Sequence, residues 1–204
     1  MGRMGYTGRI GSGLAGWLLA SCCLPMLLLA QEVSDDAVAQ RIAALTTQIK
    51  DMQRANGSWT FGVNSVGMSA LMVLALRQAG VPANDPVIQS AVGYLLQNSD
   101  ARTYGEGLVP CALEAVDPAK YRDRHRQAVA YLERAQLDDG SWSYTKANGA
   151  RPGDNSNTQF AALGLAAAER CGVLIPAAVR GRALRYWSGI QQGDGGWGYT
   201  GQGQ

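Results

Sequence analysis

The sequence lacks an excess of charge of either sign, and it is poor in residues on which many active sites depend. It has 18 Lys and Arg against 16 Asp and Glu, a formal net charge of +2, one histidine and 7% aromatic residues. This balance argues against nucleic-acid binding through general basicity and against a highly charged disordered chain. Hydrophobic residues make up 47% of the sequence, which is typical of a globular protein.

Cysteine is also scarce, and two of the four cysteines lie in the N-terminal apolar segment. The remaining pair, Cys111 and Cys171, cannot build a disulfide framework. Aligning the repeats described below places Cys111 early in one helix and Cys171 at the end of its counterpart. That offset is about 13 Å at 1.5 Å per residue, whereas a disulfide requires Cα atoms within about 7 Å. We therefore expect two free, buried thiols.

One long hydrophobic run is present, from Leu14 to Ala30, preceded by Arg3 and Arg9 and followed by a polar stretch. A basic start, an apolar stretch and a small residue before a polar mature start are typical of a secretory signal. The expected division is a signal peptide at 1–30 and a mature domain at 31–204, with export to the periplasm or the extracellular space.

Two other interpretations of this segment remain open. The sequence Leu19-Ala-Ser-Cys22 is similar to a bacterial lipoprotein box, although apolar residues follow the cysteine. The run is also close to the lower length limit of about 17 residues for a membrane span, so it could remain uncleaved as an N-terminal anchor.

Against this plain composition, one motif occurs three times with invariant spacing. It reads Gln-x-x-x-Gly-x-Trp, and its copies are Gln53, Gly57 and Trp59; Gln136, Gly140 and Trp142; and Gln191, Gly195 and Trp197. Recurrence at intervals of tens of residues predicts a repeat architecture.

The segments before the motifs also match one another. Residues 91–95, 128–132 and 183–187 superpose without gaps and align Tyr94, Tyr131 and Tyr186. The step from Tyr131 to Gln136 recurs from Tyr186 to Gln191. Applied to Tyr94, it predicts a degenerate fourth copy formed by Ser99, Thr103, Tyr104 and Gly105.

Apolar spacing predicts two kinds of helix in alternation. Segment 160–168 is apolar all round, as in a helix buried on every side, whereas 121–132 carries charge on one arc. Val38, Ile42, Leu45 and Ile49 form a similar one-sided stripe in the first helix. Such alternation predicts an inner and an outer layer, with inner helices near 65–79, 107–117 and 157–171 and outer helices near 35–53, 86–98, 119–136 and 176–191. We find no convincing strand.

The predicted helix ends have recognisable signals. Gly80 and Gly172 follow two of the inner helices, as a left-handed C-terminal glycine does. Asn64 or Ser65 is the expected N-cap of the first inner helix, Ser156 or Asn157 that of the third, and Ser34 or Asp35 that of the first outer helix.

The motif and the helix before it resemble the QW repeat of squalene and oxidosqualene cyclases, whose α/α-toroid architecture protein prenyltransferase β-subunits share. The resemblance covers nearly all of 34–199. It implies an all-α, α/α-toroid-like array that is partial and open, in which the Gln caps the next inner helix and the Trp stacks on it. Segment 153–165 also resembles exported bacterial toroid-repeat proteins of unassigned function.

The catalytic residues of the resembled enzymes are missing. Hopene-forming cyclases protonate an alkene with an Asp-x-Asp-Asp motif, which must lie in a dry cavity. Here Asp35 and Asp36 lack the first Asp, and a helix cap explains them. Asp138 and Asp139 belong to a surface turn of a motif copy. Such cavities also use many aromatic residues to stabilise carbocations, and the inner helices offer little beyond Phe160.

The sequence also lacks the residues that form a zinc site or a thioester in other proteins of the resembled architecture. A prenyltransferase zinc site needs Asp, Cys and His ligands, but the single His125 falls on an outer helix, where we expect it to be partly buried or exposed. Cys111 and Cys171 lack ligand spacing. The Gly-Cys-Gly-Glu-Gln thioester motif is absent. No metal and no cofactor is predicted.

Polar residues at the starts of inner helices are the best candidates for a binding rim: Tyr104, Glu106, Asp154, Asn155 and Asn157. In a toroid these starts can surround a central depression, although helix capping and loop solvation also explain them. An insertion at 146–153 lies beside the last three, and insertions in repeat arrays tend to fall on the binding face.

The sequence thus predicts an exported, non-catalytic repeat protein that binds a protein partner or a small apolar ligand, and no nucleic acid. The alternative is a partial or degenerate terpenoid cyclase. Because the sequence stops just after Trp197, we also expect self-association or further C-terminal repeats to complete the ring.

Overall fold

The computed structural model describes residues 34–62, 64–145 and 152–199, and these residues form seven α-helices. No β-strand occurs among them beyond one isolated bridge between Phe61 and Asn64. The helices all belong to the unit that begins at Asp35. They are α1 (Asp35–Asp51), α2 (Ser65–Gln78), α3 (Pro86–Gln97), α4 (Thr103–Val116), α5 (Arg122–Ala135), α6 (Asn155–Arg170) and α7 (Ala177–Gly189).

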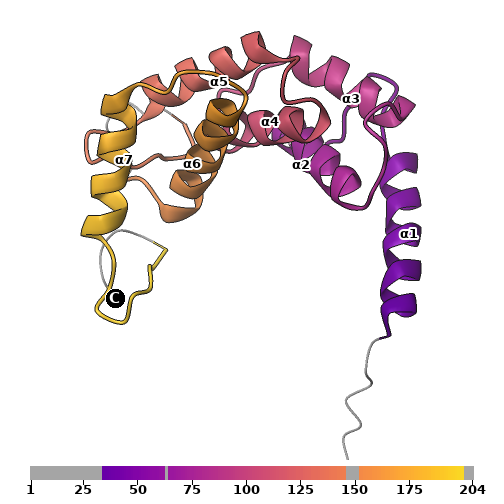
Figure 1. The fold of residues 1–204 in the computed structure, drawn as a ribbon, viewed down its shortest axis with the longest axis horizontal. Coiled ribbons are helices and arrows are strands. Elements are labelled where there is room, and N and C mark those ends of the chain that lie inside the picture. Colours follow the sequence, from indigo (N-terminus) through magenta and orange to yellow (C-terminus); the bar gives the residue numbers. More distant parts are fainter. Residues whose placement is uncertain (1–33, 63, 146–151, 200–204) are drawn as a thin grey trace, which may run out of the picture. The chain divides into compact units, whose positions relative to one another are not determined.

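The helices alternate between two layers, as in an α/α-toroid-like repeat, which confirms the predicted fold class. Helix α4 packs between α2 and α6 in the inner layer, while α5 packs across α4 and α6 and α3 packs on α2 (Figure 1). The inner helices approach closely through glycine: a Cβ on Gly107 would lie 2.4 Å from the Phe160 carbonyl oxygen, and one on Gly164 would lie 2.5 Å from the Gly107 oxygen.

Two apolar clusters hold the layers together. One joins α2, α3 and α4, and the other joins α5, α6 and α7 and includes Trp142. The largest fully buried apolar side chains are Trp142, Leu76, Ile88, Leu95, Leu113 and Leu132.

Several helix ends agree with the sequence signals, and one does not. Asn64 caps α2 by accepting a hydrogen bond from Gly67 N, as predicted. Gly80 and Gly172 have φ angles of 85° and 79°, the left-handed conformation of C-terminal caps. The N-cap of α6 is Asp154, not Ser156 or Asn157, because the Asp154 carboxylate accepts the Asn157 N–H at 2.8 Å. Helix α6 therefore begins at Asn155.

Three expectations about burial were wrong. Leu163 of α6 is 46% exposed, so this inner helix is not buried on every side. His125 is fully buried, because α5 turns it away from solvent. Cys111 is only half-buried, although both it and Cys171 are free as predicted. Cys111 also lies just past the middle of its helix and not early in it, because α4 begins at Thr103 and not at 107.

The degenerate fourth copy of the motif was also misread. Thr103, Tyr104 and Gly105 form the first turn of α4 instead of a separate turn before it. The chain passes from α3 to α4 through only the short segment 98–102.

The N-terminal segment 1–30 and most of the predicted insertion, residues 146–151, lie outside the described residues. Among the helices that the structure describes, none combines the length and the apolar character that a membrane crossing requires.

Candidate functional site

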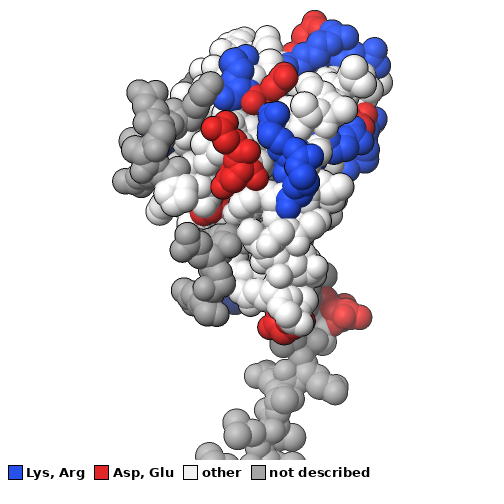
Figure 2. Space-filling model, turned by 90° about the vertical axis from the view of Figure 1, so that its left-hand side faces the viewer, with Lys and Arg blue, Asp and Glu red and all other residues white. Residues whose placement is uncertain are grey.

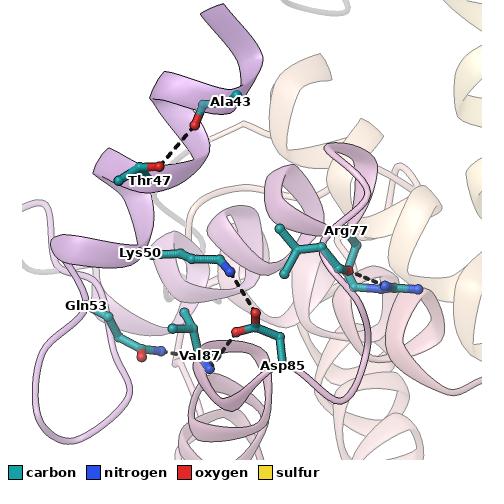
Figure 3. A network of polar contacts seen from close by, with 8 residues as sticks. Ala43, Thr47, Lys50, Gln53, Arg77, Asp85 and Val87 are labelled. Atoms are coloured by element: carbon teal, nitrogen blue, oxygen red, sulfur yellow. Dashed lines mark hydrogen bonds and ion pairs between the residues drawn. The ribbon is translucent and has the colours of Figure 1, made fainter. Parts of the chain in front are cut away.

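The glutamines of the first two motifs link their own turn to the next outer helix. Gln53 Nε2 donates to Gly57 O at 3.0 Å. It also donates to Val87 O in the first turn of α3 at 2.9 Å (Figure 3). Gln136 Nε2 makes the same pair of bonds, to Gly140 O at 3.0 Å and to Val179 O in α7 at 3.1 Å. The resemblance implied a cap on the next inner helix; in this chain the glutamine instead binds the next outer helix.

The tryptophans of these motifs connect the outer layer to the inner layer. Trp59 Nε1 donates to Ile49 O at the end of α1, while its backbone N–H donates to Ser69 Oγ in α2. Trp142 repeats this arrangement with Leu132 O in α5 and Thr158 Oγ1 in α6. Both side chains are buried, at 3% and 0% exposure. These residues hold the fold together and offer no open surface to a ligand.

The Gln and Trp side chains of the third motif make only local hydrogen bonds. Gln191 Nε2 donates to Gly195 O at 2.9 Å, and Trp197 Nε1 donates to Trp187 O at 2.9 Å. Trp197 remains 49% exposed. Within the described residues, Gln191 has no second carbonyl comparable to Val87 O or Val179 O.

The glycines of the second and third motifs show how closely each turn is packed against its neighbours. Gly140 and Gly195 both have a left-handed backbone, with φ of 93° and 86°. A Cβ on Gly140 would lie 2.3 Å from Arg182 O, whereas one on Gly195 meets no atom within 4 Å. We expect Gly195→Ala to cost about 1–2 kcal/mol from left-handed strain alone, and Gly140→Ala a further 1–3 kcal/mol or so from overpacking. Urea unfolding of the two variants checks this, and equal losses would contradict the close packing of the second turn.

Where the motif is absent, a buried ion pair makes the equivalent connection. Arg124 of α5 donates from Nε to Leu95 O at 3.0 Å, and Leu95 precedes Ser99 by the same step as Ile49 precedes Gln53. The Arg124 guanidinium thus donates to the carbonyl that is equivalent to the one bound by the Trp indole in the intact copies. Its two terminal nitrogens donate to the Glu106 carboxylate at 2.7 and 2.9 Å, and both side chains are only 2–3% exposed.

The predicted rim residues fall into three settings. Tyr104 and Asn157 line one pocket of about 300 Å³ at the starts of α2, α4 and α6, together with Phe61, Asn64, Met68, Arg102, Tyr144 and Ser156. Sequence reasoning missed these six residues, because they come from loops and helix starts that only packing brings together. The available signal was the presence of Phe61, Arg102 and Tyr144 in the segments that precede the inner helices.

This pocket joins an apolar wall to a few unsatisfied polar groups. The Tyr104 ring packs edge-on against Phe160 with centroids 4.5 Å apart, and burial raises the pKa of the Tyr104 phenol. Arg102 is half-buried, and no ion pair or side-chain hydrogen bond engages its guanidinium within the described structure. Asn157 is 2% exposed; its Nδ2 donates to Asp154 Oδ2, while its Oδ1 has no partner.

The other three rim residues have mainly structural contacts. Asp154 caps α6. Asn155 accepts from the Tyr186 hydroxyl at 2.8 Å and donates to Gly198 O, which ties α6 to α7 and to the third motif. Glu106 points away from this pocket into the ion pair with Arg124. Whether any of the five residues binds a ligand stays a prediction.

The residues considered for acid or metal chemistry lie apart from this pocket. Asp35 and Asp36 are the first two residues of α1 and are exposed. Asp138 and Asp139 are exposed in the second motif's turn, where Asp139 accepts the Ser141 N–H. No group of three or more metal-ligating side chains occurs among the residues that could be described.

Neither nitrogen of the buried His125 imidazole has a hydrogen-bond partner in the described structure. Burial lowers the pKa of this imidazole; Glu114 opposes the shift and Arg124 adds to it. A folded-state pKa below the unfolded value of about 6.5 means that the unfolded chain binds the proton more tightly.

We therefore expect the free energy of unfolding to be at its full value above about pH 6.5 and to fall as the pH drops below it, by at most about 1.4 kcal/mol per pH unit from this residue. The His125→Leu variant should lose less stability than the parent between pH 7 and pH 5. Urea unfolding across this range measures the difference, and identical pH profiles would contradict it.

The Cys111 thiol and the face of the molecule shown in Figure 2 give no sign of a reactive or strongly charged site. Burial raises the pKa of the Cys111 thiol to about 11, so it is protonated and unreactive at neutral pH. Figure 2 shows one face of the molecule on which Lys and Arg lie next to Asp and Glu instead of forming a patch of one sign.

Comparison with known proteins adds one similarity. The chain is similar to a squalene–hopene cyclase from Zymomonas mobilis subsp. mobilis, with 35% identity over 122 residues, which cover 50% of this chain and 18% of that enzyme. The chain thus matches less than a fifth of the length of that cyclase. No family model matches it. The helical fold and this similarity together support a relation to the cyclase and toroid superfamily, and they do not extend to an activity.

Proposed function

We propose that this protein is an exported, non-catalytic toroid-type repeat protein that binds a small ligand with an apolar body and an acidic group. The pocket at the starts of α2, α4 and α6 is the binding site. The observation that carries this proposal is the half-buried Arg102, whose guanidinium makes no ion pair within the described structure, beside an aromatic wall.

The chemistry of the pocket supports an anionic ligand. The first turns of α2, α4 and α6 contribute residues to it, and helix N-termini carry partial positive charge. Met68, Phe61 and Tyr104 supply apolar contact for the body of the ligand. The free Asn157 Oδ1 can accept one hydrogen bond from the ligand.

The alternative, a partial or degenerate terpenoid cyclase, is favoured by the similarity to squalene–hopene cyclase. A cyclase requires a strong acid in an apolar cavity and groups that stabilise a carbocation. No Asp or Glu occurs among the described residues that line this pocket, and Arg102 would repel a carbocation. The site therefore supports binding better than catalysis.

Export and the wider partnership rest on the sequence. The basic start and apolar run of 1–30 support a signal peptide, with an N-terminal membrane anchor as the alternative. The exposed Trp197 and the incomplete contacts of the third motif are compatible with a protein partner or a second copy at this end.

Titration calorimetry with sodium decanoate and with decanol tests the proposed site. We expect decanoate to bind at least about tenfold more tightly than decanol, because only the carboxylate can pair with Arg102. Arg102→Met should abolish this preference, whereas Arg54→Met, which removes an exposed arginine elsewhere, should leave it unchanged. Equal binding of the acid and the alcohol, or no effect of Arg102→Met, would refute the assignment.

Incubation of the full chain with squalene and with prenyl diphosphates, followed by product and metal analysis, separates binding from catalysis. We expect no cyclised or prenylated product above a heat-killed control and no stoichiometric zinc. Either product, or bound zinc, would favour the enzyme alternative.

A further inference from the structure

A second cavity, of about 370 Å³, lies on the outer layer where the repeat has lost its Gln-Gly-Trp turn. It is lined mainly by Asp100, Glu106, Arg124, Gln127, Tyr131 and Arg134. These residues come from the segment between α3 and α4, from α4 and from α5, and none of them lines the pocket of the proposed function.

The register of the repeats explains why a cavity forms here. In the intact copies the turn packs against the next outer helix at Val87 and Ser90 of α3 and at Val179 and Arg182 of α7. Arg124 and Gln127 precede Tyr131 by the same steps as Val87 and Ser90 precede Tyr94. The α5 residues that would face a turn therefore face the cavity instead.

The buried ion pair forms one wall and leaves other groups free. The Arg124–Glu106 pair is satisfied by its mutual bonds, by Leu95 O and by Asp100 N, which donates to Glu106 Oε1 at 2.8 Å. Tyr131 Oη is buried beside Thr103, and the geometry between the two side chains falls short of a normal hydrogen bond. Such an orphaned buried hydroxyl is costly unless a partner is supplied.

Two unpaired charges of opposite sign complete the lining. Neither the half-buried Asp100 carboxylate nor the exposed Arg134 guanidinium has an ion-pair partner in the part of the chain that is described. Burial raises the pKa of Asp100; Arg102 opposes the rise without cancelling it, and Glu106 adds to it. With the Arg124–Glu106 pair, the lining holds two carboxylates and two guanidiniums.

We propose that this cavity binds a small zwitterion, whose ammonium group contacts Asp100 and the Tyr131 hydroxyl and whose carboxylate contacts Arg134. A net-neutral ligand with separated charges matches the balanced lining, whereas a simple anion or cation leaves one of the two free charges unpaired. The volume is within the usual range for small-molecule sites, roughly 300–1,000 Å³.

Calorimetric titration of the full chain with glycine, β-alanine, 4-aminobutyrate and 6-aminohexanoate tests this proposal. Because the distance between the ammonium and carboxylate groups increases along this series, the best ligand shows which spacing the cavity fits. We expect saturable binding of at least one of these, and binding at least about tenfold weaker for n-butylamine and butyrate, which each carry a single charge. Asp100→Asn and Arg134→Met should each weaken the best zwitterion about tenfold or more, and Tyr131→Phe about threefold or more.

Asp123→Asn and Arg126→Met serve as matched controls, because they remove the same charges from an exposed pair on α5. Neither control should change zwitterion binding. Tyr131→Phe removes a single oxygen, so it remains informative if a charge variant fails to fold. No binding of any zwitterion up to about 10 mM, equal binding of n-butylamine, or binding insensitive to all three cavity variants would overturn the proposal.

Discussion

Replacing Trp142 with alanine should lower the free energy of unfolding by about 3–5 kcal/mol, the cost expected for truncating a fully buried aromatic side chain. Trp142 is 0% exposed and belongs to the cluster that joins α5, α6 and α7. The change also removes the indole bond to Leu132 O at 2.8 Å and leaves that carbonyl without its tryptophan partner. Urea unfolding followed by circular dichroism measures the loss.

Trp197→Ala is the matched control within the same chain. Trp197 occupies the same motif position and donates the equivalent bond to Trp187 O, but it is 49% exposed. We expect its replacement to cost about 1 kcal/mol, because only part of its apolar area leaves water on folding. If Trp142→Ala left the melting temperature unchanged while ligand binding was lost, the tryptophan would belong to a binding site.

Glu106→Gln should be nearly as damaging, with an expected loss of about 3–5 kcal/mol, because it leaves the Arg124 guanidinium as an uncompensated buried charge. Gln keeps the shape of the side chain, so the loss reports charge and not a cavity. The pair also fastens α5 to the end of α3 through Leu95 O, the place that a tryptophan fastens in the intact copies. Unfolding in urea at pH 7 gives the loss directly.

A double-mutant cycle separates the pair from its surroundings. The Glu106→Gln, Arg124→Met double variant should lose clearly less stability than the sum of the single variants, because no unpaired charge remains. The exposed pair Asp123 and Arg126 provides the comparison, and its coupling energy should stay below about 1 kcal/mol. Strict additivity at Glu106 and Arg124 would show that the two side chains act independently.

Local sequence signals accounted for most of the secondary structure. Apolar spacing placed all seven helices, and the glycines after α2 and α6 marked their ends because few other residues adopt a left-handed cap without strain. The fixed spacing of Gln, Gly and Trp identified a repeat, since each motif closes its own turn through one local bond, such as Gln53 Nε2 to Gly57 O.

The candidate site was less accessible from the sequence, because its residues are brought together by packing between helices that are distant along the chain. Tyr104 and Asn157 share a pocket, whereas Glu106, only two positions after Tyr104, points to the opposite layer. Residues two positions apart on a helix face different directions. Only the placement of α5 shows that Glu106 pairs with Arg124.

At the degenerate copy that begins at Ser99, the sequence and the tertiary structure again determined different features. Its spacing from Tyr94 was visible in the sequence, and so was the loss of its Gln, Gly and Trp. Tertiary packing replaced the missing turn with an ion pair and left a polar cavity beside it, because the carbonyl of Leu95 still required a donor and α5 supplied Arg124. Helix periodicity and turn chemistry act over a few residues and can be read locally, whereas the partner of a buried charge depends on contacts between layers.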